Sequence, residues 1–221
     1  LGVSADAPQY STGFPPHCLI VDPTDQQTML HGDLRRARGA SGAIYAYFGL
    51  NRLHTDRAQQ FGQRWLSQVV GLHWYERRPP VWILHVLSPD LRQHSKADTS
   101  LALRELQERY LQMLGFLADT TELWEGERRT TELRLLPLSG QHYGGIYNAR
   151  MPRLTLLAIC LAYGSLTARQ RARLNMDNNT QWRLCLYHEE EFSRYRTALA
   201  SMLRGSSATD WAHIRIMGSF W

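Results

Sequence analysis

Short apolar runs alternate along this chain with longer stretches of helical periodicity. The runs typical of buried strands lie at 18–21, 81–87, 133–138 and 182–187, and the aromatic tail 211–221 is typical of an edge strand. Helical patterns occupy 42–50, 56–70, 98–117, 152–166 and 189–203. Because no long Pro-, Gly- or Ser-rich linker divides this alternation, it predicts one α/β domain around a mostly parallel sheet.

The length of 221 residues is sufficient for one large domain with a substantial core. Apolar residues make up 43% of the chain and charged residues 20%, which indicates a globular rather than a disordered protein. Residues 1–16 are rich in Ser, Pro, Gly and Ala and predict an irregular lead-in to a domain over 17–221. We expect no membrane span, because the chain has no run of about 18 apolar residues.

The net charge of +5 comes mostly from arginine, since Lys96 is the only lysine. An arginine-rich surface suits phosphate-bearing ligands, nucleic acid or an acidic partner, and the lack of a compact basic tail makes nucleic acid the least favoured. Cys18, Cys160 and Cys185 lie in apolar runs without metal-ligand spacing. They predict buried thiols in a reducing compartment such as the cytoplasm, and we expect neither a metal nor a cofactor.

Two loops of small residues each follow a predicted strand directly. In the first, residues 22–25 end the strand, and 38–44 lead from glycine, alanine and serine into a helix. The second loop, 139–145, follows the strand at 133–138. Small residues let backbone N–H groups approach a phosphate closely, and helix N-termini attract anions, so these loops are candidate anion sites. The alternative is an ordinary glycine-rich turn.

Three stretches are similar, in order and in context, to motifs of macrodomains, the α/β family that binds ADP-ribose. The family's Val-Asn-Ala-Ala-Asn and Gly-Ala-Ile-His resemble residues 21–25 and 39–45, and its Ile-His-Val-Val-Gly-Pro-Asp resembles 83–90. Its Pro-Leu-Leu-Ser-Thr-Gly-Ile-Tyr-Gly resembles 137–144. This resemblance covers roughly residues 17–166 and implies a single three-layer α/β/α domain that binds ADP-ribose, with no cofactor beyond that ligand.

The resemblance also implies that the two loops hold the diphosphate of ADP-ribose between them and that Tyr143 covers the distal ribose. The candidate ligand-binding residues are Val21, Asp22, Arg38, Gly39, Ala40, Ser41, Gly42, Ile44, Ser139, Gly140, Gln141, His142, Tyr143 and Gly144.

The first loop departs from the family pattern in its charged residues. Asp22 and Asp25 replace both asparagines, and Ser41 stands where many hydrolytic members carry an aspartate. The longer linker before Gly39 adds Asp33. Carboxylates can orient ribose hydroxyls, activate water and stabilise an oxocarbenium-like transition state, so Asp25, Asp33 and Asp22 are the candidate catalytic residues. Each aspartate is also a common turn residue.

These aspartates resemble a divergent branch of bacterial effectors that removes ADP-ribose from arginine, notably on ubiquitin, in the host cytosol. Three functions remain open. The chain is an ADP-ribosyl-protein hydrolase, a reader that binds ADP-ribosylated proteins without chemistry, or a module for poly-ADP-ribose or RNA. We expect a monomer with ADP-ribose and an ADP-ribosylated protein as its partners. The sequence favours the hydrolase, followed by the reader.

Overall fold

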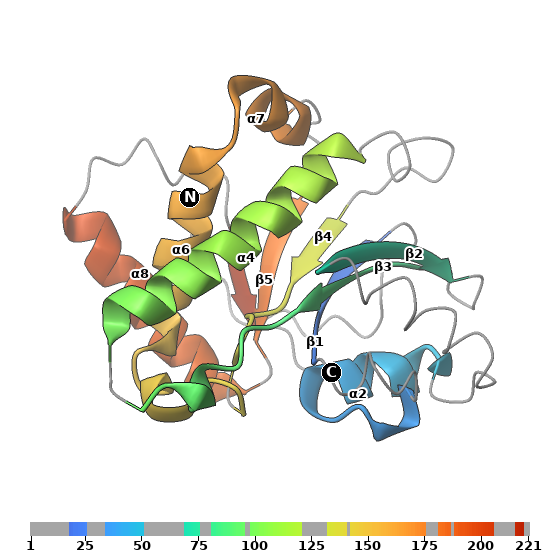
Figure 1. The fold of residues 1–221 in the computed structure, drawn as a ribbon, viewed down its shortest axis with the longest axis horizontal. Helices are drawn as coiled ribbons and strands as arrows, with labels where there is room; N and C mark the ends of the chain where they lie inside the picture. The colour runs from blue at the N-terminus through green and yellow to red at the C-terminus, as the bar shows by residue number, and fades with distance from the viewer. Residues whose placement is uncertain are drawn as a thin grey trace.

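The computed structural model describes residues 18–25, 34–50, 69–75, 81–95, 98–120, 132–140, 142–175, 181–186, 188–205 and 215–218. These residues contain a six-stranded sheet in the order β2-β3-β1-β4-β5-β6 (Figure 1). The strands are β1 (Cys18–Thr24), β2 (Val70–Tyr75), β3 (Val81–Leu87), β4 (Glu132–Leu135), β5 (Gln181–Leu186) and β6 (Arg215–Gly218). The β2–β3 pair is antiparallel and every other pair of neighbours is parallel, which confirms the predicted α/β class.

Helices cover both faces of this sheet, as a three-layer arrangement requires (Figure 1). The α-helices are α2 (Gly39–Tyr47), α4 (Thr99–Asp119), α6 (Met151–Ser165), α7 (Ala168–Asn175) and α8 (Glu189–Gly205). Short 3₁₀ helices are η1 (Leu34–Arg36), η3 (Leu91–Gln93) and η4 (Gly145–Tyr147). Residues of α4, α6 and α8 share the larger core on one face, and residues of α2 and η1 share the smaller core on the other.

The alternation of side chains along β1 divides them between the two cores. Leu19 and Val21 lie in the larger core, whereas Cys18 and Ile20 lie in the smaller one. This period of two is the expected consequence of a strand buried on both faces. It also decides that Asp22, two residues after Ile20, extends toward α2.

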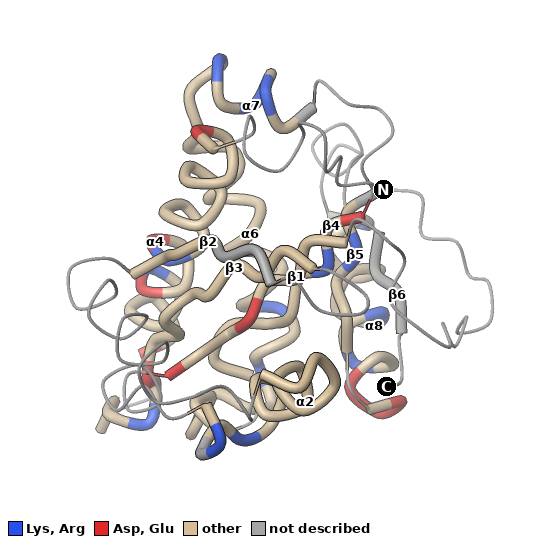
Figure 2. Tube along the Cα trace, turned by 90° about the vertical axis from the view of Figure 1, so that its right-hand side faces the viewer, with Lys and Arg blue, Asp and Glu red and all other residues tan. Residues whose placement is uncertain are grey.

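Two elements differ from the sequence prediction. The predicted helix 56–70 lies outside the described residues except at its end, where Val70 begins β2 instead. Helix α7 was not predicted. Its sequence ARQRARLN is strongly polar, with arginines in blue at α7 in Figure 2, and such a segment carries almost no apolar periodicity to detect. The predicted lead-in 1–16 lies outside the described residues.

The buried face of α2 also differs from the prediction. The helical pattern at 42–50 makes Ala43, Tyr47 and Leu50 available to face the sheet. Leu50 is fully buried as expected, but Tyr47 is 49% exposed. Ile44 and Tyr45 are fully buried instead. The helix begins at Gly39, three residues earlier than predicted, and the buried Tyr45 hydroxyl contacts polar groups at the end of the sheet.

A buried ion cluster lies on the α2 face where β4 begins. The Glu132 carboxylate accepts a bond of 2.5 Å from Arg134 Nε, and its second oxygen lies 3.3 Å from an Arg183 nitrogen. Glu132 and Arg134 are both below a tenth exposed. Removing one partner of a buried ion pair leaves the other charge without compensation, which is far more costly than losing an exposed pair.

We therefore expect Glu132→Ala to lower the free energy of unfolding by about 3 kcal/mol, because two guanidinium groups lose their carboxylate. Glu108 on the exposed side of α4 provides a matched control, and Glu108→Ala should change stability by no more than about 0.5 kcal/mol. Urea unfolding followed by circular dichroism measures both. Equal, small effects of the two substitutions would contradict a structural role for the cluster.

No single helix in the described ranges is long and apolar enough to cross a membrane. Helices α6 and α7 together are long and apolar enough for a membrane span, but the chain bends by 118° between them.

Candidate functional site

The carboxyl ends of β1, β3 and β4 meet at one edge of the sheet, because these three neighbouring strands are parallel. The chain leaves β1 for the β2–β3 side and then crosses back over β1 to form β4. Open α/β sheets bind ligands at such a change of direction, outside the carboxyl ends of the strands. The two loops that the sequence singled out both lie at this edge.

A buried polar network joins three elements at this edge. The Tyr45 hydroxyl of α2 donates a short hydrogen bond to Asp22 Oδ2 of β1. His85 Nδ1 of β3 lies 2.8 Å from the same oxygen and 3.2 Å from the Tyr45 hydroxyl. All three side chains are fully buried. The network therefore fixes α2 against the ends of β1 and β3.

Three polar atoms at the same strand ends are buried without a hydrogen-bond partner among the described residues. They are Asp22 Oδ1, Thr24 Oγ1 and Ser88 Oγ. The backbone brings two of these residues together, because Ser88 N donates to the Thr24 carbonyl at 2.9 Å. Buried polar atoms are normally hydrogen-bonded, so this group has the capacity to bind water or a polar ligand.

Helix α2 begins where β1 ends. Ser41 Oγ donates to the Pro23 carbonyl at 3.4 Å, and the N-cap residue Arg38 makes no side-chain capping bond. Because the first N–H groups of a helix lack partners within the helix, those of Gly39, Ala40 and Ser41 are available to an anion.

Two glycines in this turn are required by the backbone. Gly39 has φ of +59°, which favours glycine. A Cβ at Gly42 would lie 2.6 Å from the Ala37 carbonyl oxygen. The turn into α2 therefore depends on residues without side chains.

The loop after β4 is held against the segment after β3. Ser139 is buried, has φ of +55° and donates its hydroxyl to the Pro89 carbonyl at 2.5 Å. Leu91 N donates to the Tyr143 carbonyl at 3.0 Å. A non-glycine residue at positive φ is uncommon, and such strain persists where the surrounding structure enforces it. These bonds make one rigid unit of the two segments.

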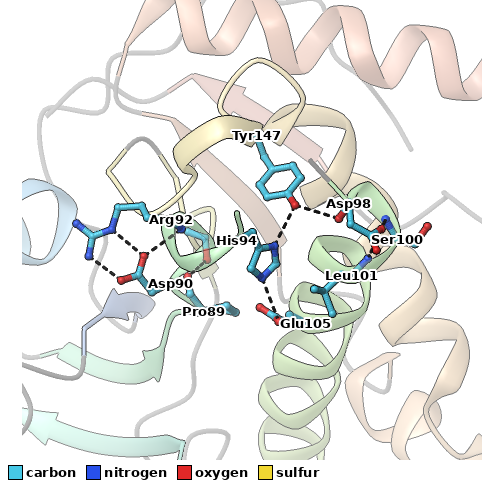
Figure 3. A network of polar contacts seen from close by, with 10 residues as sticks. Pro89, Asp90, Arg92, His94, Asp98, Ser100, Leu101, Glu105 and Tyr147 are labelled. Atoms are coloured by element: carbon cyan, nitrogen blue, oxygen red, sulfur yellow. Dashed lines mark hydrogen bonds and ion pairs between the residues drawn. The ribbon is translucent and has the colours of Figure 1, made fainter. Parts of the chain in front are cut away.

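Charged and aromatic side chains gather where these segments meet (Figure 3). Arg92 contacts Asp90 through two nitrogens, and its guanidinium lies 4.6 Å from the centre of the Tyr143 ring. The hydrogen bond from Arg92 lowers the pKa of Asp90. Burial raises the pKa of the Tyr143 phenol, and the charge of Asp25 raises it further, which indicates that Asp25 lies near this ring.

A second set of contacts anchors the same unit to α4 (Figure 3). His94 Nδ1 lies 3.0 Å from the Tyr147 hydroxyl and its Nε2 lies 3.2 Å from Glu105. The Tyr147 hydroxyl in turn donates to the Asp98 carbonyl at 3.1 Å. These bonds link η3 and η4 to the first turns of α4.

Asp22 lies in β1 and Asp25 directly after it, and the other predicted site residues fall into three groups. The side chains of Val21 and Ile44 are fully buried in the two cores, so their backbone is the part that can approach a ligand at the edge. Residues 39–42 form the first turn of α2 directly after the exposed Arg38, and 139, 140 and 142–144 lie in the loop after β4, with His142 exposed. Asp33 and Gln141 lie outside the described residues.

Sequence reasoning missed several residues at this edge. The sequence predicts His85, on a buried strand, to be a hydrogen-bonded core residue, and its burial and its bond to Asp22 confirm this; its place beside the site was not predicted. Thr24, Ser88 and Arg92 were not singled out. The position of Ser88 and Arg92 just after a predicted central strand was a signal, since residues there reach the ligand edge.

The described part of the chain holds no group of three or more His, Cys, Asp or Glu side chains placed to bind a metal ion.

We expect Tyr45→Phe to destabilise the protein by about 1–3 kcal/mol, because the buried Asp22 carboxylate loses a donor while the ring still fills its place. Tyr47→Phe removes the same atom from the exposed neighbour in α2 and should have little effect. Thermal unfolding of both variants gives the comparison. Equal melting temperatures for the two variants would show that the network contributes nothing to stability.

Comparison with known proteins gives structural matches alone. No protein-family model and no curated protein sequence matches this chain. The Oceanobacillus iheyensis macrodomain with ADP superposes with a TM-score of 0.57 and 17% identity, covering 85% of each chain. A mutant of that macrodomain superposes with a TM-score of 0.57 and 18% identity, covering 87% of this chain and 88% of the other. Another mutant of that macrodomain, with ADPR, superposes with a TM-score of 0.55 and 17% identity, covering 84% of this chain and 86% of the other.

These identities are too low to transfer a function, but the superpositions span most of both chains. They agree with the three motifs that resemble macrodomains. The chain therefore has the macrodomain fold.

Proposed function

We propose that this protein binds ADP-ribose across the carboxyl ends of β1 and β4. The observation that carries this proposal is the start of α2, which places the amides of Gly39, Ala40 and Ser41 at the end of β1. As the first amides of a helix they have no partner within it. The loop at 136–144 lies at the end of the neighbouring strand. The complexes of similar fold with ADP and with ADPR support the same class of ligand.

The chemistry of the edge suits a diphosphate flanked by sugars. Phosphate oxygens accept hydrogen bonds from the amides at the helix N-terminus, and the positive end of the helix dipole stabilises their charge. Arg38 adds an exposed guanidinium directly before these amides. The half-buried ring of Tyr143 offers an apolar surface with a polar tip for the distal ribose.

We expect calorimetry to show saturable binding of ADP-ribose, in preference to AMP and to ribose 5-phosphate. Gly42→Ala should weaken that binding about tenfold, because the new Cβ displaces the backbone that presents charge-assisted hydrogen bonds to the phosphates.

Gly164→Ala is the matched control, since a Cβ at Gly164 in α6 meets nothing within 4 Å. This variant should bind ADP-ribose like the wild type. If the wild type gave no heat of binding in calorimetry even at millimolar ADP-ribose, the binding proposal would be overturned.

We further propose that the protein removes ADP-ribose from modified protein side chains, with arginine as the favoured linkage. Asp25 supports this step, because its charge acts on Tyr143, the residue assigned to the distal ribose. Water would add to the anomeric carbon as the bond from that carbon to the guanidinium nitrogen breaks. The carboxylate would take a proton from the water and pass it to the departing guanidine.

We expect Asp25→Ala and Asp33→Ala to slow release of ADP-ribose from an ADP-ribosylated protein by about 100-fold or more, because each removes a carboxylate proposed to act in the reaction. Affinity for free ADP-ribose should change far less. Asp119→Ala removes an exposed aspartate at the end of α4 and serves as the control.

Arginine-linked and glutamate-linked substrates, tested side by side, identify the linkage. Undiminished turnover in both aspartate variants would overturn their catalytic assignment. Tight binding by the wild type without release from either substrate would establish a reader in place of a hydrolase.

A further inference from the structure

The side chain of Arg92 bridges the segment after β3 and the loop after β4. We propose that Arg92, held by Asp90, positions the Tyr143 ring and thereby gives the site its preference for ADP-ribose over ADP. Arg92 is a positioning residue in this proposal, since it acts on the ligand through Tyr143. The inference rests on the proposed binding of ADP-ribose at this edge.

Asp90 fixes the orientation of the Arg92 guanidinium. Arg92 Nε donates to Asp90 Oδ1 at 2.7 Å, and the terminal NH2 donates to Oδ2 at 2.6 Å (Figure 3). The backbone N–H of Arg92 also donates to Asp90 Oδ1 at 3.2 Å. An exposed ion pair is usually weak and mobile, but two parallel bonds to one carboxylate set the plane of the guanidinium.

The guanidinium held in this way makes two contacts with the second loop. Its central carbon lies 4.6 Å from the centre of the Tyr143 ring, and its remaining nitrogen lies 2.7 Å from His142 Nε2. His142 in turn meets the Tyr143 ring edge-on. Arg92 therefore covers one face of the ring. In this proposal the distal ribose stacks against the opposite face.

The backbone of these segments does not depend on the Arg92 side chain. Leu91 N bonds to the Tyr143 carbonyl and Ser139 bonds to the Pro89 carbonyl, and neither contact involves Arg92. Because Gly145 lacks a side chain, the loop approaches the Arg92 backbone closely. Truncating Arg92 should accordingly free the Tyr143 ring while the path of the loop is kept.

The same stack lies within the electrostatic reach of the aspartate proposed to act in catalysis. The hydrogen bond of Asp90 raises the pKa of Arg92, and the charge of Asp25 adds to this effect. Asp25 acts on Tyr143 as well. Arg92 thus places a cation among the groups at the ribose end of the proposed site.

The test measures the affinities of Arg92→Ala for ADP-ribose and for ADP by calorimetry. ADP-ribose binding should weaken about two- to tenfold, the penalty for ordering a side chain that is no longer preorganised. ADP lacks the distal ribose, so its affinity should change by less than about twofold. Arg92→Lys keeps the charge but not the planar fork, and should behave like the alanine variant.

Two further variants sharpen the comparison. Tyr143→Ala should lower the preference for ADP-ribose by itself, and adding Arg92→Ala to it should have no further effect, because the two residues act as one unit. Arg169→Ala removes an exposed arginine of α7, far from α2 in Figure 1, and should leave both affinities unchanged.

Each outcome is decisive. Equal weakening of both ligands by Arg92→Ala would indicate a general attraction for phosphate and would overturn the inference, as would an unchanged preference for ADP-ribose. In either case the proposed function stands, because the wild type still binds ADP-ribose. A wild type that binds neither nucleotide would overturn the proposed function and this inference with it.

Discussion

The site-bearing edge of this protein depends on the buried contact among Asp22, Tyr45 and His85. A carboxylate removed from water requires donors, and here they come from two different elements, a helix and a neighbouring strand. Movement of α2 away from β1 would therefore leave buried polar groups without partners. The first amides of α2, which have no partner within the helix, are held at the end of β1 by this requirement, although they make no part of the network themselves.

A second constraint shapes the opposite side of the edge. Ser139 adopts a backbone conformation unusual for serine, and its hydroxyl joins the loop after β4 to the segment after β3. Asp90 and Arg92 extend the same junction outward to the surface. The segments at the ends of three strands are thus joined to one another. At the same strand ends, buried polar atoms of Asp22, Thr24 and Ser88 have no hydrogen-bond partner among the described residues. Rigid scaffolds with loops at strand ends are suited to binding small charged ligands.

Local patterns predicted much of this arrangement. The apolar run 81–87 is β3 to the residue. The position of Asp98 and Thr99 before a leucine-rich pattern made both candidates for the N-cap, and Asp98 is the cap of α4 in the structure. Val70 shows where such patterns fail, because a short apolar segment fits a helix and an edge strand equally well. Tyr47 and Tyr45 show a second failure. Both fit an amphipathic helix, and the polar partner of Tyr45, which lies on another element, decided which of them was buried.

By itself the sequence determined the alternation of strands and helices, the small residues at both loops, and the order of motifs that resembles a macrodomain. These features are local, since they depend on backbone preferences and on side-chain spacing within a few residues. The tertiary structure alone decided that His85 meets Asp22, 63 positions earlier, and that Arg92 meets His142, 50 positions later. Those contacts follow from strand order, which places β1 between β3 and β4, and no spacing within one segment contains that information.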